Sequence, residues 1–347
     1  MKRYLVLPAL IVFAAVALQG CGDTPSDDAA PVPSTGAGAP PKDAADAATA
    51  PEAAASAMPV EPAPAGTLGG KAPAGPPYVA GVEQFRADRE ARLAGPYGWS
   101  SLIGLFWLEE GESTFGSDPD GTIVLPADAA PPLAGRFVYN GSTVRLIVEP
   151  GVSMTVGDEP VLDRQMADDA TGRPDVIGLG RLQLILLRRG DRQGIRVKDP
   201  ESPARKAFAG LEYFPIDEGW RIEGTLRRSE PVEVDVASVI GTPHKMFSPG
   251  EVEFQLDGQT LTLEALASEP DATELFMIFR DKTSGAETYE AGRYLAAPRN
   301  GDQVTLDFNM AYNPPCVFTE FATCPLPPPG NRLSVPIRAG EKDYQAQ

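Results

Sequence analysis

The chain has 347 residues and a formal net charge of -18, because 48 acidic side chains outnumber 30 basic ones. This charge argues against nucleic-acid binding, since a phosphate backbone would be repelled rather than neutralised. One histidine and three cysteines are too few for a multi-histidine metal centre, a four-cysteine zinc site or a haem-attachment motif, so we expect no cofactor and no metal.

Residues 1–21 are typical of an export signal peptide. Two basic residues precede an apolar run from Tyr4 to Leu18, which is shorter than the roughly 20 residues of a membrane-spanning helix. The string from Leu18 to Cys21 resembles the lipobox of bacterial lipoproteins, and this resemblance implies an acylated Cys21 inserted in the lipid bilayer. Gly22 and not Asp follows the cysteine, and by the sorting rule known for lipoproteins of enteric bacteria this resemblance implies a lipid-anchored envelope protein on the periplasmic face of the outer membrane. The alternative is an ordinary secretory peptide with an incidental cysteine.

Residues 22–77 have the composition of a tether. They contain 12 prolines and 17 alanines, with 7 acidic and 2 basic residues and no apolar periodicity. Such a stretch cannot bury enough apolar surface to offset its own ordering entropy. The folded domain is therefore expected at residues 78–347.

This domain is predicted to begin with one amphipathic helix that ends at Gly95-Pro96. Its stripe has three- and four-residue spacing and consists of Val79, Val82, Phe85, Arg89 and Leu93. Short alternating or apolar segments separated by turn residues follow, and they predict strands. The predicted strands are 122–125, 136–139, 143–148, 152–156, 181–187, 194–198, 220–226, 232–239, 252–256, 261–266, 275–279, 287–294, 304–308 and 333–337.

The fold class is therefore mainly β, an antiparallel barrel or sandwich with one amphipathic N-terminal helix. No helical crossover separates the predicted strands, which excludes a parallel α/β sheet. Both a barrel and a sandwich fit this pattern. So do a single domain and two β subdomains that meet near residues 215–230.

Several strings read together resemble one family, the bacterial proteins of domain of unknown function 1684 (DUF1684). These strings are Gly104–Leu108 with Gly116–Pro119, Gly194–Asp199, Thr288–Leu295 and Asp307–Asn309 through Pro325–Pro327. They occur in order over residues 80–345. The resemblance implies kinship and carries no activity to any residue.

A proline-rich stretch from Asp307 to Arg332 is the first candidate ligand-binding region. Prolines stiffen the backbone, so polar side chains can project from it at a low ordering cost. The candidate residues in this stretch are Asp307, Asn309, Tyr312, Asn313 and Arg332. The alternative is a structural cover over one end of the sheet.

Two cysteines in the same stretch, Cys316 and Cys324, enclose seven residues. In an exported protein this pair predicts a disulfide. By the chain-entropy estimate, closing so small a loop stabilises the fold by about 2.5 kcal/mol. Metal or redox chemistry is the alternative.

The segment 275–294 supplies the other candidates, Asp281, Tyr289 and Arg293. On the predicted strand 287–294, Tyr289 and Arg293 share one face, and a guanidinium suits a carboxylate or phosphate ligand. The alternative is an internal ion pair of Arg293 with Asp281 or Asp307.

A basic island at residues 181–206 holds eight Lys or Arg against three acids. Strand alternation directs Ile195 and Val197 inward and Arg196 and Lys198 outward, which predicts a solvated face. An anion-binding surface is the alternative.

Three other motifs in the sequence do not support a metal-binding or catalytic site. The string Asp118–Gly121 resembles the start of a calcium loop, but Ala129 stands where the bidentate Glu is required. Glu109 and Glu110 are adjacent, so on a strand they would face opposite sides. His244 is the only histidine, and the chain has no Gly-x-Ser-x-Gly elbow for a Ser-His-acid triad.

These observations favour binding over catalysis. The first hypothesis is a membrane-tethered lipoprotein that binds a small anionic or polar ligand through its C-terminal region. A hydrolase or transferase with Asp307 or Asp281 as general acid or base is the second. A structural or partner-docking envelope protein is the third.

Overall fold

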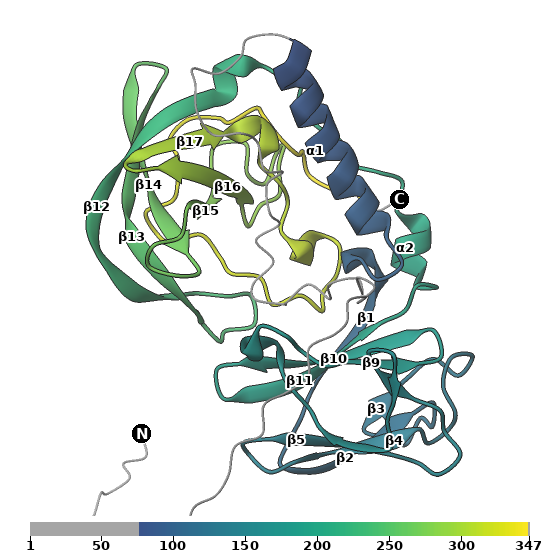
Figure 1. Cartoon of the computed structure of the whole chain (residues 1–347). Coiled ribbons are helices and arrows are strands. Elements are labelled where there is room, and N and C mark those ends of the chain that lie inside the picture. The colour runs from purple at the N-terminus through teal and green to yellow at the C-terminus, as the bar shows by residue number, and fades with distance from the viewer. Residues whose placement is uncertain (1–75, 346–347) are drawn as a thin grey trace, which may run out of the picture. The chain divides into compact units, whose positions relative to one another are not determined.

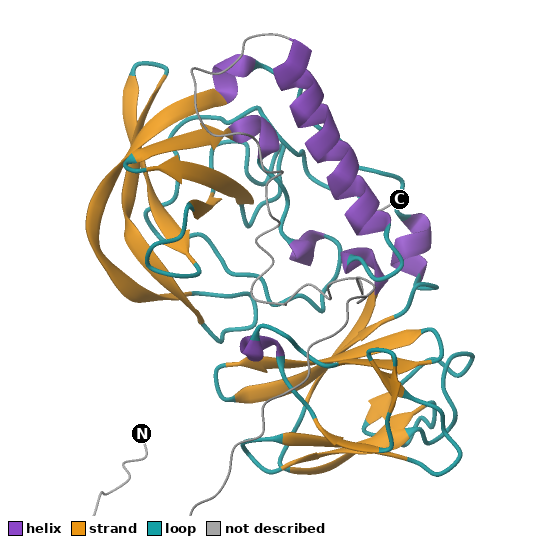
Figure 2. Ribbon diagram, in the orientation of Figure 1, coloured by secondary structure: helices purple, strands orange, loops and turns teal. Residues whose placement is uncertain are grey.

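The computed structural model describes residues 76–345, which lie within one compact unit. They form one long helix and two β modules (Figures 1 and 2). We call residues 102–198 the sandwich module and residues 221–307 the barrel module. Among the described residues, no helix is long and apolar enough to cross a membrane. The predicted leader, the predicted lipidation site Cys21 and the predicted tether up to residue 75 lie outside the described residues.

The helix α1 (Pro76–Ala94) is the one that the apolar spacing predicts. Val82, Phe85 and Leu93 are buried on one of its faces. Burial of a large apolar side chain contributes about 1.5–3 kcal/mol, so this face fixes α1 in place. The helix ends just before Gly95-Pro96, because a proline cannot continue a helix and restricts the residue before it. Figure 1 shows α1 running alongside the barrel module.

The sandwich module consists of two sheets. The first has the strand order β1-β11-β10-β9-β6-β7, with β1 (Leu102–Trp107), β6 (Thr155–Val156), β7 (Glu159–Pro160), β9 (Val176–Leu179), β10 (Leu182–Arg189) and β11 (Arg192–Lys198). The second has the order β3-β2-β4-β5-β8, with β2 (Gly111–Gly116), β3 (Ile123–Val124), β4 (Gly135–Tyr139), β5 (Val144–Val148) and β8 (Asp163–Gln165). Neighbouring strands are antiparallel, except that β2 and β3 are parallel.

One core fills the space between these two sheets. Alternation along β5 buries Val144, Leu146 and Val148, as a strand with one face on a core requires. The rings of Phe115 and Phe137 stack in this core with centroids 4.7 Å apart.

The barrel module is a closed antiparallel barrel in chain order. Its strands are β12 (Arg221–Val236), β13 (His244–Leu256), β14 (Gln259–Ala267), β15 (Glu274–Phe279), β16 (Arg293–Asn300) and β17 (Gln303–Asp307). The sequence predicts β12 as two strands, but it is one strand whose register shifts between Arg228 and Val232. Pro231 lies in this shift, where a missing backbone donor is tolerated.

The rest of the described chain is loop with short helices. These are α2 (Pro203–Ala207) and the 3-10 helices Trp99–Ser101, Asp169–Thr171, Glu218–Trp220, Phe308–Met310 and Pro315–Val317. We call residues 308–345 the C-terminal segment. Its apolar side chains, including Leu333 and Ile337, belong to the barrel core.

The mainly β class is confirmed, and the structure contains both a sandwich and a barrel. The division between the two modules falls between β11 and β12, at residues 199–220, and so begins earlier than the predicted 215–230.

Two predicted strands are wrong. The segment 287–294 forms strand only from Arg293 onward, because the Thr283 carbonyl accepts from the amides of Ala286, Glu287 and Thr288 and turns the chain back. Residues 333–337 form no strand. The strands β1, β2, β7, β8 and β9 were not among those predicted.

Candidate functional site

Arg293 and Asp281, both predicted to bind a ligand, form a buried ion pair. Arg293 Nη2 lies 3.0 Å from Asp281 Oδ2, and only 1% of the arginine is exposed. The guanidinium also donates to the carbonyls of Ile337 and Ala339, while the Thr283 amide and hydroxyl donate to Asp281. The predicted alternative, internal pairing of Arg293 with Asp281, is therefore confirmed. The shared strand face proposed for Tyr289 and Arg293 is wrong, since only the arginine lies on a strand.

Asp307 and Asn309 lie together at the end of β17, where they bind α1. The Tyr78 hydroxyl lies 2.9 and 3.0 Å from the two carboxylate oxygens of Asp307, and the Asn309 amide also donates to this carboxylate. Burial raises the pKa of Asp307, and the hydrogen bonds from Asn309 and Tyr78 partly offset this. A raised pKa suits a general acid. However, neither Asp307 nor Asp281 lines any of the three cavities described below.

The remaining predicted ligand-binding residues do not converge. Tyr312 and Asn313 line a cavity of about 10 Å³, too small for more than one water. Tyr289 is half-buried, and its hydroxyl lies 3.8 Å from the Cys316 thiol. Arg332 is exposed. The eight predicted residues therefore form separate clusters and not one pocket.

A second buried ion pair, which the sequence reasoning missed, joins α1 to the C-terminal segment. Arg89 pairs with Glu341, and both side chains are almost completely buried. Arg89 Nη2 also donates to the Asn313 carbonyl at 2.8 Å. The sequence did offer a signal for this pair, because Arg89 lies within the apolar stripe of α1 and a cation buried there requires a partner.

A narrow cavity lies between the sandwich module, the barrel module and the C-terminal segment, and we call it the Arg196 slot. Its volume is about 30 Å³, which is room for a few atoms. It is lined by Trp99, Arg189, Arg196, His244, Phe276, Tyr294, Pro315, Thr323, Cys324 and Pro325.

Arg196 is the central feature of this slot. It lies on β11 between Ile195 and Val197, whose side chains enter the sandwich core. Alternation places Arg196 on the opposite face of the sheet, as predicted, but that face is covered and the residue is only 4% exposed. The predicted solvated position of Arg196 is therefore wrong. The covering residues come from elsewhere in the chain, such as Trp99 and Cys324.

Two nitrogens of the Arg196 guanidinium lack hydrogen-bond partners among the described residues. Its Nε and Nη2 atoms are buried, and within residues 76–345 neither has a hydrogen-bond acceptor. The group stacks on the Trp99 ring, with the guanidinium carbon 5.0 Å from the centroid. Burial, together with the nearby charge of Arg189, lowers the pKa of Arg196 to about 10. The side chain is therefore a buried cation at neutral pH.

The other polar groups of the slot are paired. Arg189 binds Asp169 at 2.6 Å and the Thr323 hydroxyl at 3.0 Å. His244 Nε2 lies 2.6 Å from the Thr323 carbonyl, so this nitrogen carries the donated proton. Burial lowers the pKa of His244, which is therefore neutral at pH 7. Among the described residues that line the slot, Arg196 is the one charged group without an ion-pair partner.

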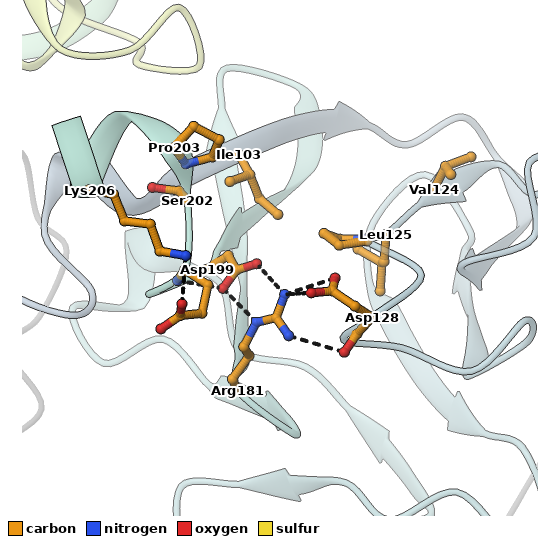
Figure 3. A pocket seen from close by; sticks show the side chains of 11 residues that line it. Ile103, Val124, Leu125, Asp128, Arg181, Asp199, Ser202, Pro203 and Lys206 are labelled. Carbon is orange, nitrogen blue, oxygen red and sulfur yellow. Dashed lines mark hydrogen bonds and ion pairs between the residues drawn. The ribbon is translucent and has the colours of Figure 1, made fainter.

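A larger groove of about 610 Å³ lies between the edge strands β1 and β3 (Figure 3). Arg181 Nη2 and Nε lie 2.9 Å from carboxylate oxygens of Asp128 and Asp199, respectively. Lys206 pairs with Glu201 at 2.7 Å. Every charged group that lines this groove is therefore in an ion pair, and three acids against two bases leave one net negative charge, which does not favour an anionic ligand.

Cys316 and Cys324 are adjacent but free thiols, so the predicted disulfide is not formed in the structure. The Cys316 amide donates to the Cys324 sulfur at 3.1 Å. Cys324 also lines the Arg196 slot.

Residues 206–342 match a family model described as a protein of unknown function, DUF1684. Residues 206–342 of the chain belong to the DUF1684 family. The match covers the barrel module and most of the C-terminal segment, so the strings at residues 104–119 and 194–199 lie outside it. The Arg196 slot is built from residues inside and outside the matched range, since Arg196 precedes this range whereas His244 and Cys324 lie within it.

The search of the curated proteins found no match to the chain. Among solved structures, an uncharacterized protein of Haloarcula marismortui, determined by solution NMR, is 37% identical. The alignment covers 41% of this chain and 80% of that protein, with a TM-score of 0.35. The FHA domain of FhaA, solved with an intracellular domain of another protein, is 23% identical over 27% of this chain and 97% of that domain, with a TM-score of 0.20.

Proposed function

We propose that this protein binds a small anion in the Arg196 slot. The observation that carries the proposal is the buried guanidinium whose Nε and Nη2 have no acceptor among the described residues. A buried charge without a partner is costly, and a bound anion would remove that cost by accepting two charge-assisted hydrogen bonds.

The two free donors are the pair that binds carboxylates elsewhere in this protein. Nε and Nη2 of Arg164 donate to the two oxygens of Asp175 at 3.2 and 3.0 Å. The same two atoms of Arg145 bind Asp163. Arg196 therefore offers the side-on fork that matches a carboxylate or another oxyanion.

The walls of the slot limit the ligand to a small monovalent oxyanion. A volume of about 30 Å³ admits an anion of the size of formate or nitrate and excludes a polycarboxylate. Asp169 compensates Arg189, so the slot offers one net positive charge. The aromatic rings of Trp99 and Phe276 provide an apolar wall without competing acceptors.

Titration calorimetry on the full chain tests this proposal with sodium formate and sodium nitrate, and with citrate as a control for size. Arg196→Gln should weaken binding by at least about tenfold, because a charge-assisted hydrogen bond contributes about 1.5–3 kcal/mol. The matched control is Arg145→Gln, which removes an exposed arginine that uses the same donor pair. Binding that survives in Arg196→Gln, or that is lost equally in both variants, would contradict the proposal.

We further propose that acylated Cys21 anchors the protein in the lipid bilayer of the cell envelope, at the periplasmic face of the outer membrane. The support is the sequence itself, a basic start followed by an apolar run and the string Leu18-Gln19-Gly20-Cys21. Cells fed labelled palmitate should incorporate the label into the wild-type chain and not into Cys21→Ser. Equal labelling of both chains would overturn the assignment.

A further inference from the structure

The two thiols of the C-terminal segment lie beside the Arg196 slot and differ in their surroundings. Cys324 is 4% exposed and forms part of the slot wall, whereas Cys316 is half-buried. The Cys316 amide donates to the Cys324 sulfur, and the Tyr289 hydroxyl lies 3.8 Å from the Cys316 sulfur. One thiol is therefore accessible, and a protected thiol lies next to it.

The two thiols also differ in acidity. Hydrogen bonding to Cys324 lowers the pKa of Cys316, with a further contribution from Tyr289. Burial raises the pKa of Cys324. The thiolate is the reactive form of cysteine, so Cys316 is the better nucleophile of the two.

We infer that Cys316 and Cys324 form a redox-active dithiol whose oxidation to a disulfide strengthens anion binding in the Arg196 slot. This inference rests on the proposed function for its second half, whereas the dithiol itself stands on the geometry of the pair. The oxidant is a small-molecule disulfide.

The reaction is thiol–disulfide exchange in two steps. Cys316 loses its proton and attacks one sulfur of the small-molecule disulfide, so a mixed disulfide forms and one thiolate leaves. That thiolate takes up the proton. Cys324 then loses its own proton and attacks the Cys316 sulfur, which closes the protein disulfide and releases the second small thiol. The two protein thiols are oxidised, and one small-molecule disulfide is reduced to two thiols.

The residues around the pair connect this chemistry to the slot. The Thr323 carbonyl binds His244 at 2.6 Å, and the Thr323 hydroxyl binds Arg189 at 3.0 Å. The Pro325 carbonyl accepts from the Tyr294 hydroxyl at 2.9 Å. Pro315, next to Cys316, also lines the slot. A bond between Cys316 and Cys324 would therefore restrain the slot wall both at Pro315 and at Thr323 and Pro325.

The restraint that the disulfide places on the slot wall predicts that oxidation strengthens anion binding. A wall that is already ordered loses less conformational freedom when the anion binds, so the oxidised form should bind more tightly.

The experiment equilibrates the full chain with glutathione disulfide or with reduced glutathione. Mass spectrometry of the peptides reads the 316–324 crosslink, and calorimetry with formate and nitrate gives Kd in each state. We expect a Kd about fivefold lower in the oxidised form, within the usual range of coupling between two sites. Cys324→Ser and Cys316→Ser should show equal Kd values in both buffers. Cys21→Ser is the matched control and should keep the full redox response.

Each outcome decides a separate point. A crosslink that forms without any change in Kd overturns the coupling and leaves the proposed function intact. A chain that forms no crosslink in glutathione disulfide overturns the dithiol. Absence of anion binding in both states contradicts the proposed function, and the redox coupling falls with it even if the crosslink is observed.

Discussion

Arg196 and Arg145 present the same edge of the guanidinium to different surroundings. Arg145 is exposed and binds Asp163 through Nε and Nη2, whereas the same atoms of Arg196 are buried and lack an acceptor in the described chain. An exposed pair of this kind contributes little to stability. The buried cation is the one for which a ligand changes the free energy most, because water cannot compensate it.

His244 allows a pH test of the same region, because it is the only histidine in the chain. Burial is the main cause that lowers its pKa below 6.5, Arg189 adds to this shift, and the Thr323 carbonyl and Asp169 oppose it. The unfolded chain therefore binds more protons in the window just below pH 6.5. The His244 contribution to stability is present above that window and is lost as the pH falls through it.

We expect urea unfolding to show a decline in the free energy of unfolding as the pH falls from 7 to 5.5, and His244→Gln should reduce this decline. The comparison of the two proteins at each pH removes the carboxylate contributions that they share. Identical pH profiles for wild type and variant would show that His244 has the same pKa in the folded and unfolded states.

Strand alternation placed Arg196 on the face opposite Ile195 and Val197, and this part of the prediction is correct. It could not show that the face is covered. The residues that cover it, such as Thr323 and Cys324, lie more than a hundred positions away in the chain, and no local pattern records such a contact. For the same reason the prediction chose Arg293 as the ligand-binding arginine.

At the scale of the elements, α1 is the part of the fold that the sequence predicts best. Its apolar spacing is regular over the whole helix, and Gly95-Pro96 marks its end. The prediction placed Arg89 in the apolar stripe without assigning it a partner. That partner, Glu341, comes from the opposite end of the chain.

The ion pair between Arg89 and Glu341 should therefore fix α1 to the C-terminal segment. Arg89→Met should lower the free energy of unfolding by about 3–5 kcal/mol, because it leaves a buried carboxylate without its cation. Chemical denaturation monitored by circular dichroism measures this loss.

The matched control is the double variant Arg89→Met with Glu341→Gln, which removes both charges and should recover a large part of the lost stability. If the double variant is as unstable as the sum of the two single variants, the two side chains are not coupled and the role assigned to the pair is wrong.

The strand predictions succeeded where burial alternates along the strand and failed where local hydrogen bonds form a turn. Segments with period-two burial, such as β5 and β10, were located within one or two residues. The segment 287–294 was misplaced because the Thr283 carbonyl folds it into a turn, and turn hydrogen bonds compete with strand pairing. The register shift at Pro231 joined two predicted strands into one.

At the scale of the whole described chain, the slot depends on parts that the sequence presents separately. The sandwich module supplies Arg189 and Arg196, the barrel module supplies His244, and the C-terminal segment supplies Cys324. The mainly β class and the possibility of two subdomains followed from the strand pattern. A site between two modules depends on their docking, which the periodicity of either module does not encode.

The most direct test of the account is the NMR signal of the Arg196 Nε–H group during titration with sodium formate. We predict a saturable downfield shift of this proton as the anion accepts its hydrogen bond, while the Nε–H signal of Arg145 stays in place. A signal of Arg196 that does not move at a saturating formate concentration would contradict the proposal that its guanidinium binds a small anion.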